Sequence, residues 1–158
     1  MAGAVRSFEE LLAFFADNRI PHQADVAHRL VEVASQAAPL PGNLLIKWEP
    51  TLPFVQVIHV MIDAVPEDRA HEVEAAMARL NNLLEVGGFG LDHERRRLYC
   101  QLTVPSFARE GLNPMTLIQI ATRVVRNGKE FVDAFGEVVA GRPGAEIVEI
   151  CRARRGAR

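Results

Sequence analysis

The sequence predicts an α+β domain in the order α-β-β-β-α-β-β-α, with a five-stranded antiparallel sheet and packed helices. Segments rich in β-branched and apolar residues, such as residues 43–49 and 54–63, are joined by short turns, as is typical of antiparallel strands. Amphipathic helical segments stand before, between and after these strands. With 158 residues, the chain is long enough to bury one hydrophobic core.

The first helix is predicted from Ser-Phe-Glu-Glu at residues 7–10. The Ser7 hydroxyl and the Glu10 carboxylate can each accept a hydrogen bond from a free backbone N–H at a helix start. The helix should end before Ile20-Pro21, because the residue before a proline disfavours helical geometry. Four apolar residues recur at helical spacing along it: Phe8, Leu11, Leu12 and Phe15.

Residues 22–38 fit either a helix or a strand. Val26, Leu30, Val33 and Ala37 can line one face of a helix. We favour a strand from about Arg29, because β-branched residues precede the breaker Pro-Leu-Pro-Gly at 39–42.

Residues 43–49 and 54–63 predict an antiparallel pair joined by Pro-Thr-Leu-Pro. Both faces of the second strand are apolar, so we expect a central strand that is covered on both sides. One layer of helices covers only one face of a sheet, which leaves the other to a second layer or to another chain. The two faces carry Phe54, Ile58, Val60 and Ile62, and Val55, Val57 and Met61.

A second helix is predicted over 66–80, because Pro66 suits the first helical position and Glu67 and Asp68 suit the positive end of the helix dipole. Its apolar residues are Ala70, Val73, Met77 and Leu80. It should stop at Asn81-Asn82. Strands are then expected over 84–91 and 98–104, joined by the charged turn 92–96.

The last long helix should begin at Asn113-Pro114, where Asn caps and Pro occupies the first turn. Gly128 is expected to kink or interrupt it, and Gly141 to end it. We therefore predict a single domain over residues 1–141. Residues 142–158 are expected to form a loosely attached basic tail.

The stretch NNLLEVGGFGLD, residues 81–92, raises the alternatives of a phosphate-binding loop or a bent strand. A dinucleotide loop needs a strand, then glycines, then a helix, whereas here the helix comes before the glycines. Each strand glycine costs roughly 0.5–1 kcal/mol relative to alanine, so a bulge, or the close approach of another backbone, helix or subunit, should offset that cost. We predict a bent strand whose register is fixed by Phe89.

These segments resemble the YbjN-type domain family and, more distantly, the class I chaperones of type III secretion. The resemblance covers about Ser7 to Ala140, and it is best over 79–135, where a helix ending LNNLL leads into GGFGLD, RLYCQLTVP and LNPMTLIQIATRVVRNGKEFVDAF. It implies a non-enzymatic, usually dimeric α+β domain that holds a protein client or acts as a regulator. The chain is therefore expected to be a homodimer that binds a protein client. Its two cysteines, Cys100 and Cys151, lie far apart without a CxxC motif, which indicates reduced thiols in a cytoplasmic protein.

Two surfaces follow from this expectation. Large aromatic residues near strand ends are good recognition anchors, so Trp48 and the first helix are the predicted client surface: Phe8, Leu11, Leu12, Phe15, Ile46 and Trp48. The second helix, beside the glycine strand, is the predicted dimer interface: Val73, Met77, Leu80, Gly87, Gly88 and Phe89.

Side chains capable of chemistry occur without the partners that catalysis needs. His71 lies four residues after Glu67 and fits a solvated pair better than a metal site. His59 is expected in a core or interface, and Cys100 is expected as an inert core thiol. Its neighbours in the sequence supply no base. We expect no enzyme, no cofactor and no metal.

The C-terminal arginines are possible anion contacts: Arg152, Arg154, Arg155 and Arg158. The alternative function is thus a nucleic-acid-associated adaptor, although the net charge of −2 and the lack of aromatic residues in the tail favour a solubilising role. A third alternative is a dimer that binds a small molecule at the subunit boundary. Apolar runs are too short for a membrane span, so no membrane partner is expected.

Overall fold

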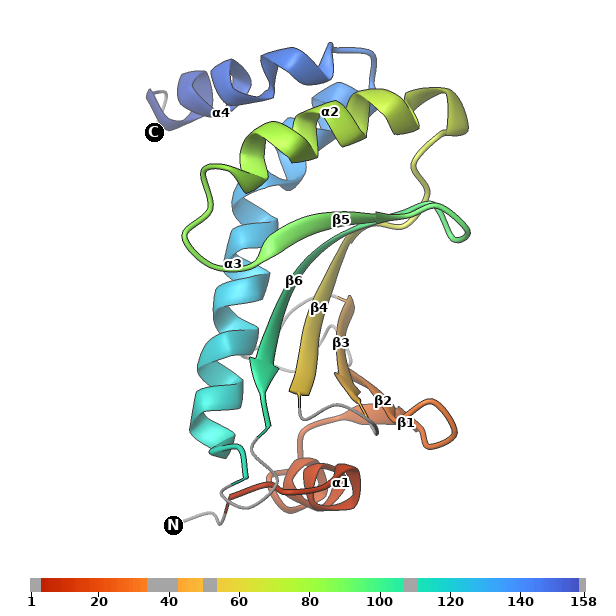
Figure 1. Cartoon of the computed structure of the whole chain (residues 1–158), viewed down its shortest axis with the longest axis vertical. Coiled ribbons are helices and arrows are strands. Elements are labelled where there is room, and N and C mark those ends of the chain that lie inside the picture. Colours follow the sequence, from red (N-terminus) through yellow and green to blue (C-terminus); the bar gives the residue numbers. More distant parts are fainter. Residues whose placement is uncertain (1–3, 34–42, 50–53, 107–110, 157–158) are drawn as a thin grey trace. The chain divides into compact units, whose positions relative to one another are not determined.

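The structure is a computed structural model that describes residues 4–33, 43–49, 54–106 and 111–156. The predicted turns at 39–42 and 50–53 lie outside these residues. The helices and strands are, in chain order, α1 (Phe8–Asp17), β1 (His22–Asp25), β2 (Leu30–Val33), β3 (Asn43–Trp48), β4 (Phe54–Ile62), η1 (Glu67–Arg69), α2 (Ala70–Asn81), β5 (Gly88–Asp92), β6 (Arg97–Pro105), α3 (Pro114–Val139), η2 (Gly144–Glu146) and α4 (Ile147–Gly156) (Figure 1).

The strands form a six-stranded sheet in the order β1-β2-β3-β4-β6-β5. The predicted α+β class with an antiparallel sheet is confirmed, but the sheet has six strands where the sequence predicted five. The additional strand is β1, which pairs antiparallel with β2, with His22 opposite Val33 and Asp25 opposite Leu30. Its sequence, HQAD, has no apolar alternation, so only its pairing with β2 makes it a strand.

The prediction of a strand from about Arg29 is confirmed by β2, and the helical alternative for the described part of this segment is wrong. The turn from β1 to β2 is held by Asp25. Its carboxylate accepts hydrogen bonds from the His28 backbone N–H at 3.1 Å and from the His28 ring at 2.7 Å. These hydrogen bonds lower the pKa of Asp25 below its usual value.

Helices α1 and α3 begin at the capping residues that the sequence predicted. Ser7 Oγ accepts the Glu10 N–H at 3.2 Å, and the Glu10 carboxylate accepts the Arg6 N–H at 2.7 Å. At the start of α3, the Asn113 side chain accepts the Met115 N–H at 2.8 Å. The second helix departs slightly from the prediction, because the 3-10 turn η1 precedes α2.

The structure corrects two details of the predicted helix and strand limits. The helix α3 runs without a break over 26 residues, so of the two alternatives for Gly128, a kink or an interruption, the interruption is wrong. Strand β5 starts at Gly88 rather than at Leu84, because Gly87 has a φ of 83°, which a strand residue does not adopt.

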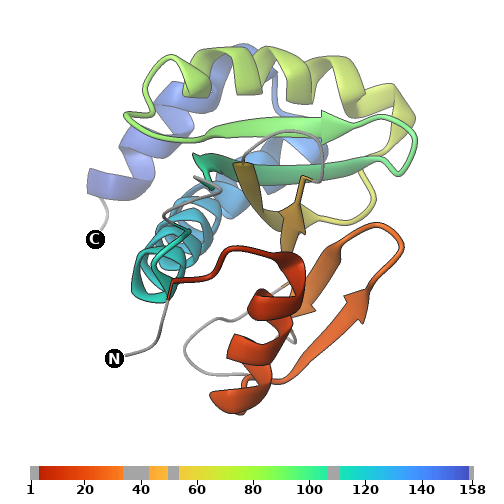
Figure 2. The same cartoon turned by 60° about the horizontal axis from the view of Figure 1, so that its bottom comes forward.

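The chain divides into two compact units, each built from two chain segments. Unit 1 comprises Met1–His59 and Gln101–Val125. In it α1 lies beside the β1–β2 hairpin (Figure 2), and the ring centroids of Phe15 and His22 are 5.3 Å apart. Its fully buried side chains include Phe8, Leu11, Val31, Val33, Leu44, Ile46, Val55 and Leu117.

Unit 2 comprises Val60–Cys100 and Arg126–Arg158. Its core joins the edge strand β5 to the second half of α3. The Phe89 ring meets the rings of Phe131 and Phe135 edge-on, with centroids 5.5 and 5.1 Å apart. Phe89 therefore anchors β5 to α3.

The C-terminal segment is not the loosely attached tail that the sequence predicted. Helix α4 packs against α2 (Figure 1), and Ile147 and Ile150 are buried, with 0% and 5% of their surface exposed. Sequence patterning missed this helix because it has only ten residues, among them a run of arginines and a glycine.

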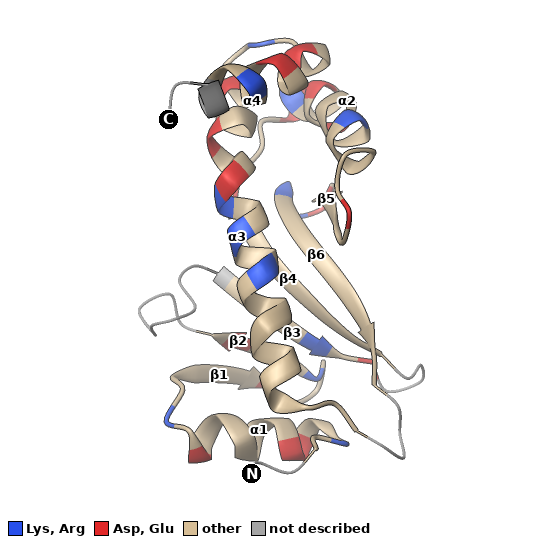
Figure 3. Cartoon of the chain, turned by 90° about the vertical axis from the view of Figure 1, so that its left-hand side faces the viewer, with Lys and Arg blue, Asp and Glu red and all other residues tan. Residues whose placement is uncertain are grey.

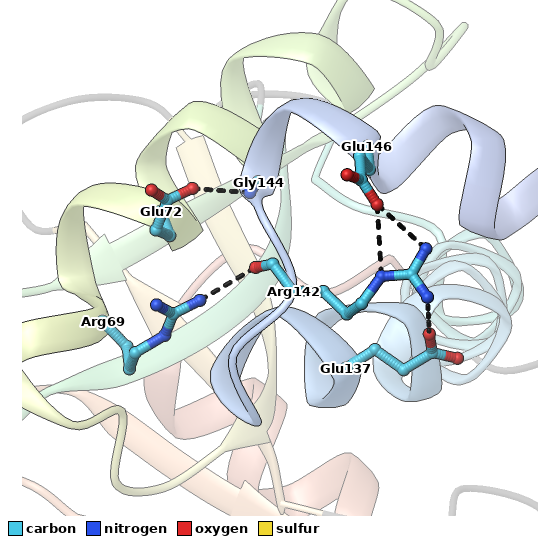
Figure 4. Close-up of polar contacts among 6 residues, drawn as sticks. All are labelled: Arg69, Glu72, Glu137, Arg142, Gly144 and Glu146. Atoms are coloured by element: carbon cyan, nitrogen blue, oxygen red, sulfur yellow. Dashed lines mark hydrogen bonds and ion pairs between the residues drawn. The ribbon is translucent and has the colours of Figure 1, made fainter.

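A C-terminal clamp, which we define as Arg69 and Glu72 gripping the backbone of residues 138–144, holds this segment. The Arg69 guanidinium donates to the Val138 carbonyl at 2.6 Å and to the Arg142 carbonyl at 2.8 Å. The Glu72 carboxylate accepts the Gly144 N–H at 2.6 Å (Figure 4). Each such bond to a charged group typically contributes about 1.5–3 kcal/mol.

Gly144 should be the least replaceable residue of the clamp. A Cβ at this position would overlap the Glu72 carbonyl oxygen, which belongs to the backbone of α2 and cannot move aside alone. We expect Gly144→Ala to lower the free energy of unfolding by about 1–3 kcal/mol, the usual cost of overpacking, as measured by urea denaturation.

Gly136→Ala is the matched control for this experiment. A Cβ at Gly136 meets no atom within 4 Å, so this variant should be more stable by about 0.5–1 kcal/mol through helix propensity alone. Equal stabilities of the two alanine variants would show that α4 is not docked on α2 as described.

Candidate protein-binding surface

The glycine-rich stretch is a strand whose outer edge is closed by a side chain. The Asn81 amide, at the end of α2, donates to the Phe89 carbonyl at 3.0 Å and accepts the Phe89 N–H at 2.7 Å. Both groups of one residue point to the same side of a strand, so Asn81 occupies hydrogen-bonding positions that a neighbouring strand would use. This contact blocks edge-to-edge pairing at Phe89 on β5.

The third glycine of the stretch makes room for an aromatic ring. A Cβ on Gly90 would overlap the ring of Tyr99, which comes from the paired strand β6. An aromatic side chain lying over a strand glycine shields the backbone from water and restores part of the lost packing. The prediction of a strand is thus confirmed, and the close approach that offsets the cost of this glycine is made by a side chain.

Strands β2 and β3 of unit 1 have two very different faces. The register pairs Val31 with Ile46 and Val33 with Leu44, and all four are at most 1% exposed. The residues between them face the other way and are half-buried or exposed: Leu30, Glu32, Leu45 and Lys47.

Strand β4 repeats this alternation. Val55, Val57 and His59 are buried, whereas Phe54, Gln56 and Ile58 are half-buried. We call the surface formed by the half-buried and exposed side chains of these three strands the open face. It consists of Leu30, Glu32, Leu45, Lys47, Phe54, Gln56 and Ile58.

The open face has an apolar centre and polar surroundings. Leu45, Phe54 and Ile58 supply apolar surface that the described residues of unit 1 leave partly accessible. Lys47 forms an ion pair with Glu49, with the two charged atoms 2.5 Å apart, on the same face. This distribution is typical of a protein–protein interface, in which charged residues are moved to the rim.

Strand β1 stands at the edge of the sheet order next to this face. Gln23, Ala24 and Asp25 are all exposed, and no other described strand pairs with its outer side. It therefore differs from β5, whose edge is occupied at Phe89 by Asn81. An exposed strand edge is a template for an added strand from another chain.

The predicted client surface is largely wrong in its residues. Leu12 is half-buried, but the other five side chains are at most 6% exposed, because they form the core under the strands: Phe8, Leu11, Phe15, Ile46 and Trp48. Their large apolar side chains gave the same sequence signal as an interface. Leu45, Phe54 and Ile58 of the open face are partly accessible, and Leu45 lies on the opposite side of β3 from Ile46 and Trp48.

The residues predicted for the dimer interface are split by the structure. Val73, Leu80 and Phe89 are buried within the chain, which corrects their assignment as direct dimer contacts. Gly87 is exposed, and Met77 and Gly88 are half-buried. Two further apolar residues lie next to them in the loop from α2 to β5, with 63% of Leu83 and 46% of Val86 exposed.

Cys100, His59 and His71 are the titratable side chains that the sequence singles out. Burial raises the pKa of the Cys100 thiol to about 12, which keeps it protonated and unreactive at neutral pH. His59 is 6% exposed on the buried face of β4, and His71 is exposed on α2. Over the ranges that the structure describes, no three His, Cys, Asp or Glu side chains cluster as metal ligands.

The C-terminal arginines lie at or beyond the end of the described residues. Arg152 is exposed on α4, Arg154 and Arg155 belong to the same helix, and Arg158 lies outside the described residues. Acidic and basic residues are mixed over α2 and α4 (Figure 3). Among the described helices, none is long and apolar enough to cross a membrane.

The close approach of Tyr99 to Gly90 gives a test with a unique reporter, because Tyr99 is the one tyrosine in the sequence. Gly90→Ala should displace the ring, shifting its NMR signals and lowering the free energy of unfolding by about 1–3 kcal/mol. In the control Gly88→Ala, the added Cβ would lie 3.6 Å from Asn81 Oδ1, an ordinary contact. A Tyr99 signal that moves no further in Gly90→Ala than in Gly88→Ala would contradict the described packing.

Comparison with known proteins identifies the fold. No protein-family model and no curated protein sequence matches the chain. Among solved structures, it is similar to YbjN from E. coli, described as a candidate transcription regulator, with a TM-score of 0.52 and 8% identity over 80% of this chain and 95% of that one. A chain of the HopA1–SchA chaperone–effector complex matches with a TM-score of 0.49 and 14% identity, covering 78% and 94% of the two chains. The predicted resemblance to the YbjN-type fold is therefore confirmed, and it is a likeness of fold.

Proposed function

We propose that this protein is a non-catalytic, chaperone-like or regulatory module that acts as a homodimer and binds a segment of a protein client on the open face. The observation that carries the proposal is the alternation of buried and partly accessible side chains in β2, in β3 and in residues 54–59 of β4. Their inward side chains are completely buried, while apolar side chains on the outward face stay partly accessible. Water is a poor partner for Leu45, Phe54 and Ile58, so another protein is the natural cover.

The client is expected to be an extended segment with apolar side chains at alternate positions. Such a segment can place its side chains on the open face, and it can add a strand at the exposed edge of β1. Backbone hydrogen bonds at β1 would supply affinity for many sequences, and the apolar centre would supply selectivity. We expect this binding to occur in the cytoplasm, where the two cysteines of the sequence, Cys100 and Cys151, remain reduced thiols.

The homodimer is proposed to form through unit 2. Leu83 and Val86 expose large apolar side chains in a single loop, which runs from the end of α2, the helix that carries Met77, to Gly88, where β5 begins. Exposed apolar residues in one patch mark interaction sites more reliably than isolated ones. This proposal keeps Met77, Gly87 and Gly88 from the sequence prediction and adds the two loop residues.

Photocrosslinking tests client binding on the open face. With p-benzoylphenylalanine in place of Phe54, irradiation in native cell extract should give one dominant protein adduct. Ile58→Asp should reduce its yield at least about tenfold, since an unpaired carboxylate in an apolar interface costs more than the roughly 1.4 kcal/mol that corresponds to a tenfold change.

The matched control is the same probe at Met115, which is 60% exposed on α3. The proposal fails if both probes give the same adducts, or if Ile58→Asp retains the wild-type yield while its circular dichroism is unchanged. Adducts made only with nucleic acid, and lost in high salt, would support the adaptor role of the C-terminal arginines instead.

Replacing the exposed loop residues tests the dimer. Leu83→Glu with Val86→Glu should convert the dimer to a monomer and raise the dissociation constant at least about a hundredfold, because charge repulsion is added to the loss of apolar burial. Analytical ultracentrifugation measures this change.

Val26→Glu is the control for the dimer experiment, because Val26 is 66% exposed, nearly the same as Leu83, but lies in unit 1. A monomeric wild-type protein, or equal dissociation constants for the two variants, would rule out the loop as the dimer contact.

A further inference from the structure

Unit 2 contains a cavity that the proposed protein-binding function does not use. Its volume is about 370 Å³, within the range of small-molecule sites. One wall comes from the segment that leads into α2, and the other comes from β5 and the turn that follows it. The backbone N–H of Val65 donates to the Arg96 carbonyl at 2.8 Å and ties the two walls together. The lining residues are Val65, Glu67, Ala70, Leu91, His93 and Arg96.

The apolar part of the lining is built into the unit. Ala70 and Leu91 are half-buried and present apolar surface to the cavity, and Val65, which is 1% exposed, packs behind them. Small-molecule sites typically combine such a surface with a few polar groups that set the orientation of the ligand.

Several charged residues around the cavity form ion pairs within the chain. The His93 ring pairs with the Glu74 carboxylate at 3.0 Å, and Arg95 pairs with Asp92 at 3.2 Å. Arg97 likewise pairs with Asp63 at 3.2 Å.

Glu67 and Arg96 do not follow this pattern. Neither side chain forms a hydrogen bond or an ion pair with another described residue, although both line the same cavity. Two opposite charges are thus left available beside one apolar surface.

These opposite charges restrict the kinds of ligand that the cavity can bind. A simple anion would be attracted by Arg96 and repelled by Glu67, and a simple cation would meet the reverse. A molecule that carries both charges, with an apolar group between the walls, satisfies all parts of the lining.

We propose that this cavity binds the zwitterion of a free α-amino acid with an apolar side chain. Its carboxylate pairs with the Arg96 guanidinium, whose planar fork matches a carboxylate. Its ammonium group pairs with the Glu67 carboxylate, and its side chain contacts the half-buried Ala70 and Leu91. His93, held by Glu74, borders the site.

The test is an NMR titration of the full-length protein with L-leucine. The amide signals of Val65, Ala70 and Leu91 should shift with saturation at millimolar concentrations. Leucinamide lacks the carboxylate and N-acetyl-leucine lacks the ammonium group, so each should bind at least about tenfold more weakly, the loss of one charged contact.

Two variants identify the charged contacts. Arg96 has a φ of 54°, so Arg96→Asn removes the charge with a residue that tolerates this backbone conformation. Glu67→Gln removes the other charge without changing the shape of the side chain. Each should weaken L-leucine binding at least about tenfold, whereas Arg95→Gln, next to the cavity but not lining it, should leave the affinity unchanged.

The proposal is overturned if L-leucine up to about 10 mM shifts none of these signals. It is equally overturned if both derivatives bind as well as L-leucine, or if inorganic phosphate alone reproduces the shifts. Because the cavity residues belong to neither the open face nor the Leu83–Val86 loop, these results are independent of client binding and of dimer formation.

Discussion

The alternation of completely buried and partly accessible side chains in β2, β3 and β4 is the constraint on which the rest of the structure depends. Antiparallel strands expose every second residue to the opposite face, so the core of unit 1 takes one set and leaves the other. Burial of Val31, Ile46 and Val55 fixes the register, since a slip by one residue would exchange the two faces. The apolar character of the open face therefore persists in every correctly folded molecule.

Much of the fold could be predicted from local signals in the sequence. The capping residues Ser7 and Asn113 mark helix starts because their side chains bond to backbone groups nearby in the chain. Strands β3 and β4 follow from their β-branched and apolar composition. The elements that were missed depend on contacts with other segments. Strand β1 is a strand because β2 pairs with it. Helix α4 is docked through clamp residues such as Glu72, which lies 72 positions before Gly144 in the sequence.

The binding surface was less predictable for a related reason. Hydrophobicity shows that a side chain avoids water, but it does not show whether the same chain or another one covers it. Trp48 and Phe8 were therefore assigned to an interface although they belong to the core. Asn81 illustrates the opposite case, because its role at the edge of β5 depends on a backbone pair eight residues away that has no signature in residue type.

The C-terminal clamp determines which residues of this segment can be replaced. Arg69 and Glu72 grip carbonyl oxygens and an N–H group, and every amino acid except proline supplies both. At positions 138 and 142 the gripped atoms therefore survive almost any replacement, and only the gripping residues and Gly144 must be retained. The clamp is thus preserved by three positions, and apart from the buried Ile147 and Ile150 the surface of α4 is free to diversify toward new partners while its attachment stays the same.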